Sequence, residues 1–166
     1  MLQKLLEQNR ESIIAEWIDL TINSYEPEMV RFLKREKNPF ANPVRSTIVT
    51  NIAKLFDGIL NGFNMDECSQ GLDEIIKLRA VQDFSPSMAL AFIFDLKKIV
   101  HKKMKDQLLS DDLVKELYQF GEQIDLLTRM AFDIYTKYRN KIYEIRLSEI
   151  RSQSQRAFEI LGRPKK

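Results

Sequence analysis

The chain has few of the residues that catalyse, cross-link or interrupt helices. Its 166 residues include one cysteine, Cys68, and one histidine, His101. A single thiol excludes an internal disulfide and any cysteine-based zinc site within one chain, and it is typical of a reducing compartment. The five glycines never cluster into a phosphate-binding loop, and no Gly-x-Ser-x-Gly nucleophile motif occurs. The sequence therefore predicts a protein that is not an enzyme.

Long apolar runs and an excess of charge are also missing. No apolar run approaches the roughly 20 residues that a membrane-spanning helix needs. The first 17 residues are interrupted by charges every few positions, unlike a signal or transit peptide. The 26 Lys+Arg nearly balance the 24 Asp+Glu, whereas a nucleic-acid-binding face needs clustered positive charge. These absences predict a cytoplasmic domain that binds neither nucleic acid nor membrane.

Helical periodicity is what the sequence does contain. Five prolines and five glycines are few, and nothing in the chain has the alternation of a strand. Asn42 and Ser85, each followed by a proline, are predicted N-caps, and Ser110 with two aspartates after it marks one more helix start. Helices are predicted up to about residue 23 and over residues 27–33, 43–61, 72–81, 86–108 and 111–161. The fold class is therefore an all-α bundle of five to six helices.

The last predicted helix is too long for the domain. Its apolar residues step by four and three from Leu113 to Tyr138, as in a packed seam. A continuous helix over 111–161 would be roughly 75 Å long at 1.5 Å per residue, so its end should project or meet a partner chain. Residues 1–150 are thus predicted as the domain and 151–166 as the helix end and a basic tail.

Aromatic residues late in this helix suggest an interface. Exposed helical aromatics are typical of interfaces, and core packing is the alternative. Core packing is predicted for Tyr118 and Phe120, which come early in the helix. The predicted dimer or partner interface comprises Tyr135, Tyr138, Ile142, Tyr143 and Ile145.

His101 allows three interpretations. A single histidine beside an aromatic-rich helix face is what a haem ligand requires, and a solvent-facing histidine near lysines is how a phosphotransfer domain presents its nucleophile. However, His101 lies one residue past the predicted buried face, and Lys105 occupies the position where phosphotransfer needs a small residue. We expect a surface histidine near the end of its helix, with no cofactor and no metal site. The predicted buried face is Ala89, Phe92, Ile93, Leu96, Ile99 and Val100.

The stretch RAVQDFSPS places polar residues at the joint between two helices. Arg79 and Asp83 are expected to pair with each other or to satisfy free backbone groups at the helix ends. The alternative is a small anionic ligand held by Arg79 near the helix start at Ser85. The candidate ligand-binding residues are Arg79, Gln82, Asp83 and His101.

Three segments carry a resemblance to a known family. IIKLRAVQDFSPSMALAFIFDLKKIVHKKM, FDIYTKYRNKIYEIRLSEI and NPFANPVRSTI are similar to the N-terminal domain of RsbRD, an RsbT co-antagonist in bacterial stress signalling. The similarity runs from about Leu5 to Ile150. It implies a sensory or regulatory input domain of the kind found ahead of STAS domains in stressosome-type proteins or of histidine-kinase cores. Related RsbR input domains resemble globins without haem and form dimers, with a last helix leading into the output domain.

The resemblance implies no catalytic residues, but it does supply a family signature without an assigned role. That signature comprises Arg79, Gln82, Asp83, Phe84 and Pro86. Here the chain ends at LGRPKK with no output domain, so it is either free-standing or part of a longer protein. The expected function is a dimeric signalling input domain that acts by protein contact on a STAS-type or kinase-type partner. The alternatives are a haem or small-molecule sensor and a histidine phosphotransfer domain.

Overall fold

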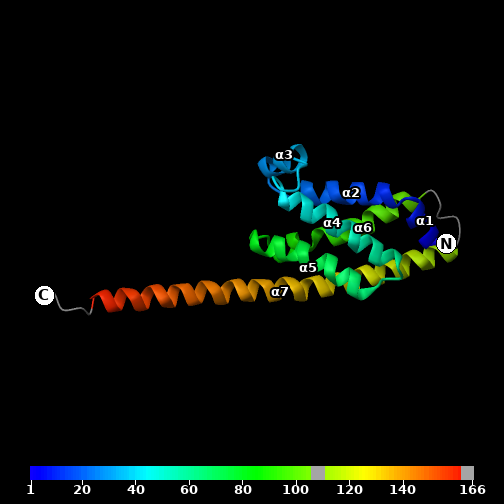
Figure 1. Ribbon diagram of the computed structural model, residues 1–166. Helices are drawn as coiled ribbons and strands as arrows, with labels where there is room; N and C mark the ends of the chain where they lie inside the picture. Colours follow the sequence, from blue (N-terminus) through cyan, green and yellow to red (C-terminus); the bar gives the residue numbers. More distant parts are fainter. Residues whose placement is uncertain (106–110, 162–166) are drawn as a thin grey trace.

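The computed structural model describes residues 1–105 and 111–161 (Figure 1). Ser110 and the basic tail after residue 161 lie outside these residues. Seven helices make up the described ranges, with no strand between them, so the all-α prediction is confirmed. Their bounds are α1 Leu2–Gln8, α2 Arg10–Asn23, α3 Pro27–Arg35, α4 Pro43–Leu60, α5 Met65–Val81, α6 Pro86–Met104 and α7 Asp111–Leu161.

Local caps explain most of these boundaries. The Asn42 side chain accepts a hydrogen bond from the Arg45 amide, and the Ser85 hydroxyl accepts one from the Met88 amide, so both predicted N-caps are confirmed. The predicted continuous first helix is wrong, because the backbone leaves helical geometry at Asn9. There the side-chain amide donates 2.8 Å to the Leu5 carbonyl and ends α1.

The core forms where α2, α4, α5, α6 and α7 pack together. α5 lies between α4 and α7, while α2 contacts both α4 and α6. Trp17 on α2 is fully buried, stacks on Phe92 and meets the edge of Phe56. Its indole nitrogen also donates to the Phe92 carbonyl at 2.6 Å, so a large apolar ring is buried without losing its hydrogen bond.

Two glycines let α4 and α5 approach closely. A methyl group at Gly71 would lie 3.0 Å from the Asn51 carbonyl oxygen and 3.0 Å from Leu55 Cβ, both on α4. Gly58 on α4 is in the same situation against Cys68 on α5. Any larger residue at either position would push the two helices apart.

α7 runs beneath the bundle and continues far beyond it (Figure 1). Its 51 residues span about 75 Å at 1.5 Å per residue. The predicted seam is buried as far as Ala131, its last members Ile134 and Tyr138 are half-buried, and most residues after Tyr138 are exposed, so the projecting helix is confirmed. Tyr118 is 69% exposed and its predicted core position is wrong, because the adjacent Leu117 occupies the core side of the helix. Within the described ranges no helix combines the length and apolarity needed to cross a membrane.

Candidate functional site

The corner between α5 and α6, residues 82–85, has an unusual backbone. Asp83 lies in the left-handed region with φ of 58°, where glycine is the usual residue. The next amide, of Phe84, donates back to the Arg79 carbonyl at 3.2 Å. This bond closes a Schellman-type helix end, and aspartate tolerates the left-handed conformation better than most residues do. The corner is thus a defined turn that projects the Asp83 side chain outward.

Arg79, one turn before the corner, is completely buried. Its guanidinium donates to the Met88 carbonyl at 2.9 Å, the Thr21 carbonyl at 3.1 Å and the Ser24 hydroxyl at 2.9 Å. The predicted pairing of Arg79 with Asp83 is therefore wrong. The other expectation is confirmed for Arg79, because its guanidinium donates to the Thr21 carbonyl in the last turn of α2. Arg79 fastens α5 to α2 and α6.

No carboxylate of the described residues forms an ion pair with Arg79. Three aromatic rings surround its charge instead, with centroids 5.5 Å away at Tyr25, 5.0 Å at Phe84 and 5.1 Å at Phe92. Burial lowers the pKa of Arg79. Burying an ion in a protein costs roughly several kcal/mol. The cation–π contacts and the hydrogen bonds to neutral acceptors offset part of that cost.

The corner also contacts α7, through a group of residues that we call the latch: Asp83, Phe84, Tyr135, Arg139 and Arg146. Arg139 bonds to the Asp83 carboxylate and donates to the Ala80 carbonyl at 3.0 Å. Arg146 lies 3.7 Å from the same carboxylate, and the Tyr135 hydroxyl donates to the Phe84 carbonyl. The hydrogen bond and charge of Arg139 lower the pKa of Asp83. In Figure 1 this contact lies where α7 leaves the bundle.

The tyrosines of the predicted interface have different environments. Tyr135 is 5% exposed and belongs to the core and the latch, so it lies off the exposed surface of α7. Half-buried Tyr138 donates to Asp73 on α5 at 2.7 Å, and this hydrogen bond raises the pKa of Tyr138 to about 12. Tyr143 is half exposed, with Arg139 stacked 5.1 Å from its ring centroid. Only Tyr143 of the three presents much of its ring to solvent.

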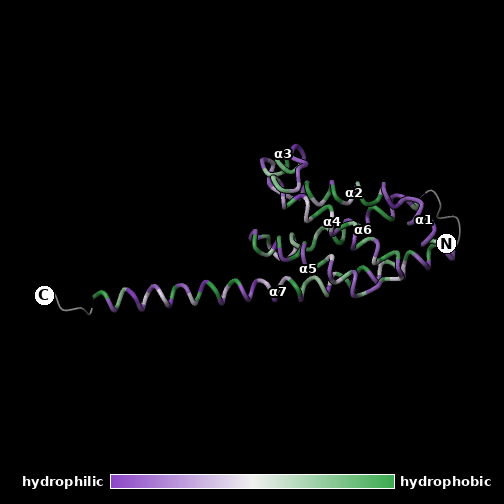
Figure 2. Tube along the Cα trace, in the orientation of Figure 1, coloured by the Kyte–Doolittle hydropathy of each residue, from purple (hydrophilic) through white to green (hydrophobic). Residues whose placement is uncertain are grey.

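The projecting part of α7 has apolar residues on two opposite sides. With about 100° per residue, Tyr138, Ile142 and Ile145 continue the core-facing side, whereas Tyr143 lies farther around the helix, beside Arg139 and the α5–α6 corner. A second apolar stripe begins at Tyr143 and steps by four and three residues. The sequence analysis missed this stripe because it continued the seam that starts at Leu113 into the projecting part of the helix. We define the outer stripe as Tyr143, Leu147, Ile150, Ala157 and Leu161, with Ser154 as its one polar position. Apolar and polar residues alternate along this segment in Figure 2.

His101 lies far from the corner. It is exposed near the end of α6, as predicted, and about 22 Å along that helix from its start at Pro86. It borders a surface cavity of about 450 Å³ together with Leu117 and Tyr118 of α7. The structure therefore places Gln82 and Asp83 at one cavity beside the corner, turns Arg79 into the core, and leaves His101 apart. The six predicted buried residues of α6 are all buried.

Reactive groups are few elsewhere in the described part of the chain. Cys68 is buried against α4, and burial with the nearby Glu67 charge raises the pKa of its thiol to about 11. No three His, Cys, Asp or Glu side chains of these residues are grouped for a metal ion. The corner, the latch and the exposed end of α7 are therefore the candidate functional surface.

Comparison with protein-family models relates the chain to a known family. The family model described as RsbT co-antagonist protein RsbRD N-terminal domain matches residues 11–150. The matched region includes the corner, the whole latch and the first half of the projecting part of α7. Neither the curated proteins nor the solved structures yielded a match.

Proposed function

The chain belongs to the RsbT co-antagonist RsbRD N-terminal domain family, and from this premise we propose that it is a non-catalytic signalling input domain that acts by protein contact through α7. The family is one of regulatory signalling domains of the stressosome type. The proposal extends to a cytoplasmic location, a globin-like bundle and a STAS-type or kinase-type partner, as in related input domains. The long helix that leaves the bundle is the natural route for the signal.

One observation carries the proposed mode of action, namely the outer stripe. Leu147, Ile150 and Leu161 are 52%, 58% and 82% exposed. Steps of four and three are the period of a coiled coil, which requires a second helix of the same period. A second copy of this chain would supply such a helix in its own α7. We therefore propose a homodimer in which two α7 helices pack along their outer stripes.

The opposite side of α7 then remains available. Tyr138, Ile142 and Ile145 continue from the core seam and end at Ile145, after which Glu149 and Arg156 occupy this side. This shorter apolar surface borders the bundle itself, so it can report a change in packing. We propose it as the contact for the signalling partner, in keeping with the interface predicted from the sequence.

The alternatives find less support. His101 lies on the surface at the end of α6, which gives it no access to a haem held between the helices. The same exposure would suit phosphotransfer, but Leu117 and Tyr118 of α7 border the histidine, and no observed feature points to a phosphate there.

Sedimentation velocity on wild type and two variants tests the dimer. Wild type should sediment as a dimer. The double variant Leu147→Glu/Ile150→Glu should sediment as a monomer, because it places charges on the outer stripe, which the proposed dimer buries. Ile145→Glu is the matched control, since Ile145 is 51% exposed but lies on the opposite side. A monomeric wild type, or dissociation by the control alone, would reject the proposed interface.

Disulfide trapping tests the orientation of the two helices. In a parallel dimer in register, Ile150 faces Ile150 of the second copy, so Ile150→Cys should cross-link rapidly under mild oxidation. The native Cys68 is buried and contributes no background. Ile145→Cys should remain reduced, and the opposite pattern would contradict the arrangement.

A further inference from the structure

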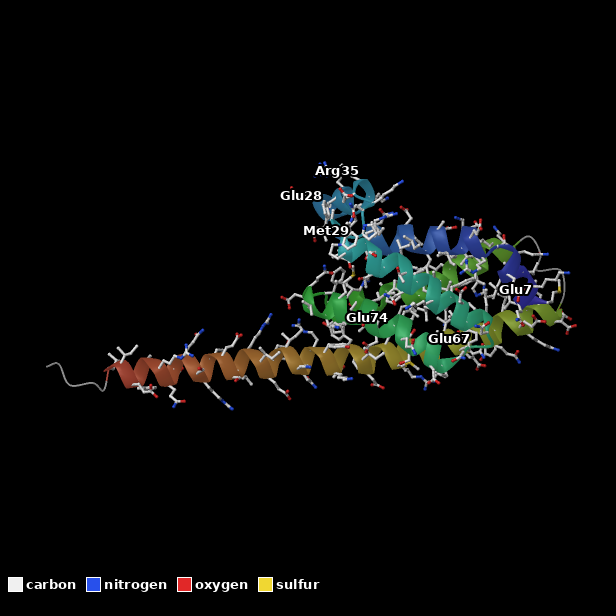
Figure 3. The ribbon with its side chains drawn as sticks, in the orientation of Figure 1. Glu7, Glu28, Met29, Arg35, Glu67 and Glu74 are labelled. Carbon is white, nitrogen blue, oxygen red and sulfur yellow. The ribbon has the colours of Figure 1, made fainter. Side chains whose placement is uncertain are left out.

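A cavity of about 380 Å³ lies between the α2–α3 loop and the α5–α6 corner. Met29 and Met88 contribute its apolar surface together with the rings of Tyr25 and Phe84, and Gln82 adds an amide. Figure 3 shows Met29 on the side of α3 that faces the bundle. The cavity volume falls in the range of about 300–1,000 Å³ that is typical of small-molecule sites.

Unsatisfied polar atoms cluster at this cavity. The buried side-chain atoms of the described residues that have no hydrogen-bond partner are the Tyr25 hydroxyl, the Gln82 Oε1 and the Arg79 Nε. Tyr25 and Gln82 line the cavity, and Arg79 lies directly behind the Tyr25 and Phe84 rings. Buried polar groups are nearly always paired in native proteins. Tyr25 and Arg79 interact with each other, but a guanidinium can only donate, so the Tyr25 hydroxyl proton and the Gln82 Oε1 are the groups that a ligand would complete.

We propose that this cavity binds a small uncharged molecule with an apolar body and one hydrogen-bonding group. The methionines and aromatic rings would surround the apolar body, because such side chains adapt to varied shapes. The Tyr25 hydroxyl and the Gln82 amide would bond the polar group. Tyr25 is 9% exposed, and burial raises its pKa, so the hydroxyl stays protonated and can donate.

Charge around the cavity selects against ions of either sign. Glu26 lines the cavity and its carboxylate would repel an anion, whereas the Asp83 carboxylate is paired with Arg139 and Arg146 of α7. The buried guanidinium of Arg79 lies behind the inner wall and would repel a cation. A neutral ligand avoids both costs, since charge repulsion is strong where water is scarce. The proposed class therefore differs from the small anionic ligand that was the alternative interpretation of Arg79 from the sequence.

The cavity shares residues with the latch. Asp83 and Phe84 line it and also bind Arg139 and Tyr135 of α7. A ligand against Phe84 would thus change the packing of the corner that holds α7. A role of this cavity as the stimulus site rests on the proposed function, in which α7 carries the signal from the input domain to a partner.

Methionine methyl NMR tests the site directly. The chain has six methionines, of which only Met29 and Met88 line this cavity. We would titrate full-length protein carrying ¹³C-labelled methionine methyl groups with benzyl alcohol, benzoate and benzylamine. Benzyl alcohol should shift Met29 and Met88 selectively, with the two charged analogues binding at least about 5-fold more weakly.

Two variants test the polar contacts. Tyr25→Phe and Gln82→Leu should each weaken benzyl alcohol binding about 3- to 10-fold, which corresponds to loss of one hydrogen bond. Tyr118→Phe, at an exposed tyrosine on α7, should leave the affinity unchanged. The methyl spectrum of each variant also reports whether it is folded.

Any of three results would overturn the proposal: no selective shift of Met29 and Met88, tighter binding of benzoate, or wild-type affinity in both cavity variants. Sedimentation of the same samples separates this outcome from the proposed function. A dimer that ignores benzyl alcohol would reject the site alone. A monomer that binds benzyl alcohol would reject the dimer alone.

Discussion

Arg79 allows the sharpest test of how the corner is stabilised. Its side chain is completely buried, makes hydrogen bonds to neutral acceptors only, and lies among three aromatic rings. Three substitutions separate its roles. Arg79→Ala removes the volume, the charge and the hydrogen bonds, Arg79→Met keeps most of the volume, and Arg79→Lys keeps a charge without the planar fork.

The expected costs differ because each variant leaves a different defect. Arg79→Ala should lower the free energy of unfolding by about 3–5 kcal/mol, as for other large buried side chains cut to alanine. Arg79→Met should lie within about 1.5 kcal/mol of wild type, because no carboxylate is left unpaired and a desolvated charge is removed. The Thr21 carbonyl keeps the Ser24 hydroxyl as a donor at 2.6 Å, so it is not left unsatisfied.

Arg79→Lys should make stability depend on pH in a defined direction. A lysine buried without a carboxylate has a pKa below its usual value of about 10.4. At a pH between the lowered pKa of the folded state and the usual pKa of the unfolded state, the unfolded chain binds a proton that the folded chain does not. The free energy of unfolding therefore rises with pH in this window. Each unit in that window adds about 1.4 kcal/mol relative to wild type, whose arginine stays charged.

Urea unfolding followed by circular dichroism between pH 6 and pH 10 would measure these effects. The difference between Arg79→Lys and wild type at each pH removes the contribution of other titrating groups. A difference that stays constant over this range would mean that the lysine charge reaches solvent or a carboxylate. A cost for Arg79→Met equal to that of Arg79→Ala would mean that the charge itself stabilises the fold. Either result refutes the reasoning.

Three further predictions concern the packing of α5, its thiol and the latch. Gly71→Ala should lose about 1–3 kcal/mol in urea unfolding through contact with α4, whereas Gly121→Ala, with open space around it, should gain about 0.5–1 kcal/mol; equal values would contradict the close approach. The Cys68 thiol, with its pKa raised to about 11, should react with a disulfide reagent at pH 8 only after unfolding, and fast native labelling would disprove its burial. Because the pKa of Asp83 is lowered in the folded state, its carboxylate stabilises the fold above about pH 4, and this stabilisation is lost as pH falls through the lowered pKa. Asp83→Asn should therefore be less stable than wild type above about pH 4 and equally stable in acid. A difference between the two that persists in acid would exclude the ion pair of Asp83 with Arg139 as its cause.

The sequence by itself determined the helices and most of the core. Helical spacing, proline after Asn42 and Ser85, and the seam from Leu113 onward are local signals, because caps and periodicity act within one or two turns. The same signals predicted the solvent-facing His101 and the projection of α7, since a helix of that length exceeds the width of the bundle. The family resemblance rested on the same segments and is confirmed over residues 11–150.

Only the tertiary structure decided what the corner residues do. Arg79 finds its acceptors 58 residues earlier at Thr21, and Asp83 finds Arg139 56 residues later. The sequence places Arg79 and Asp83 four residues apart, which suggested a pair. The left-handed turn at Asp83 instead sends the two side chains to opposite sides of the corner, one into the core and one to α7. Such long-range partners depend on how helices pack, and local sequence carries no record of that packing.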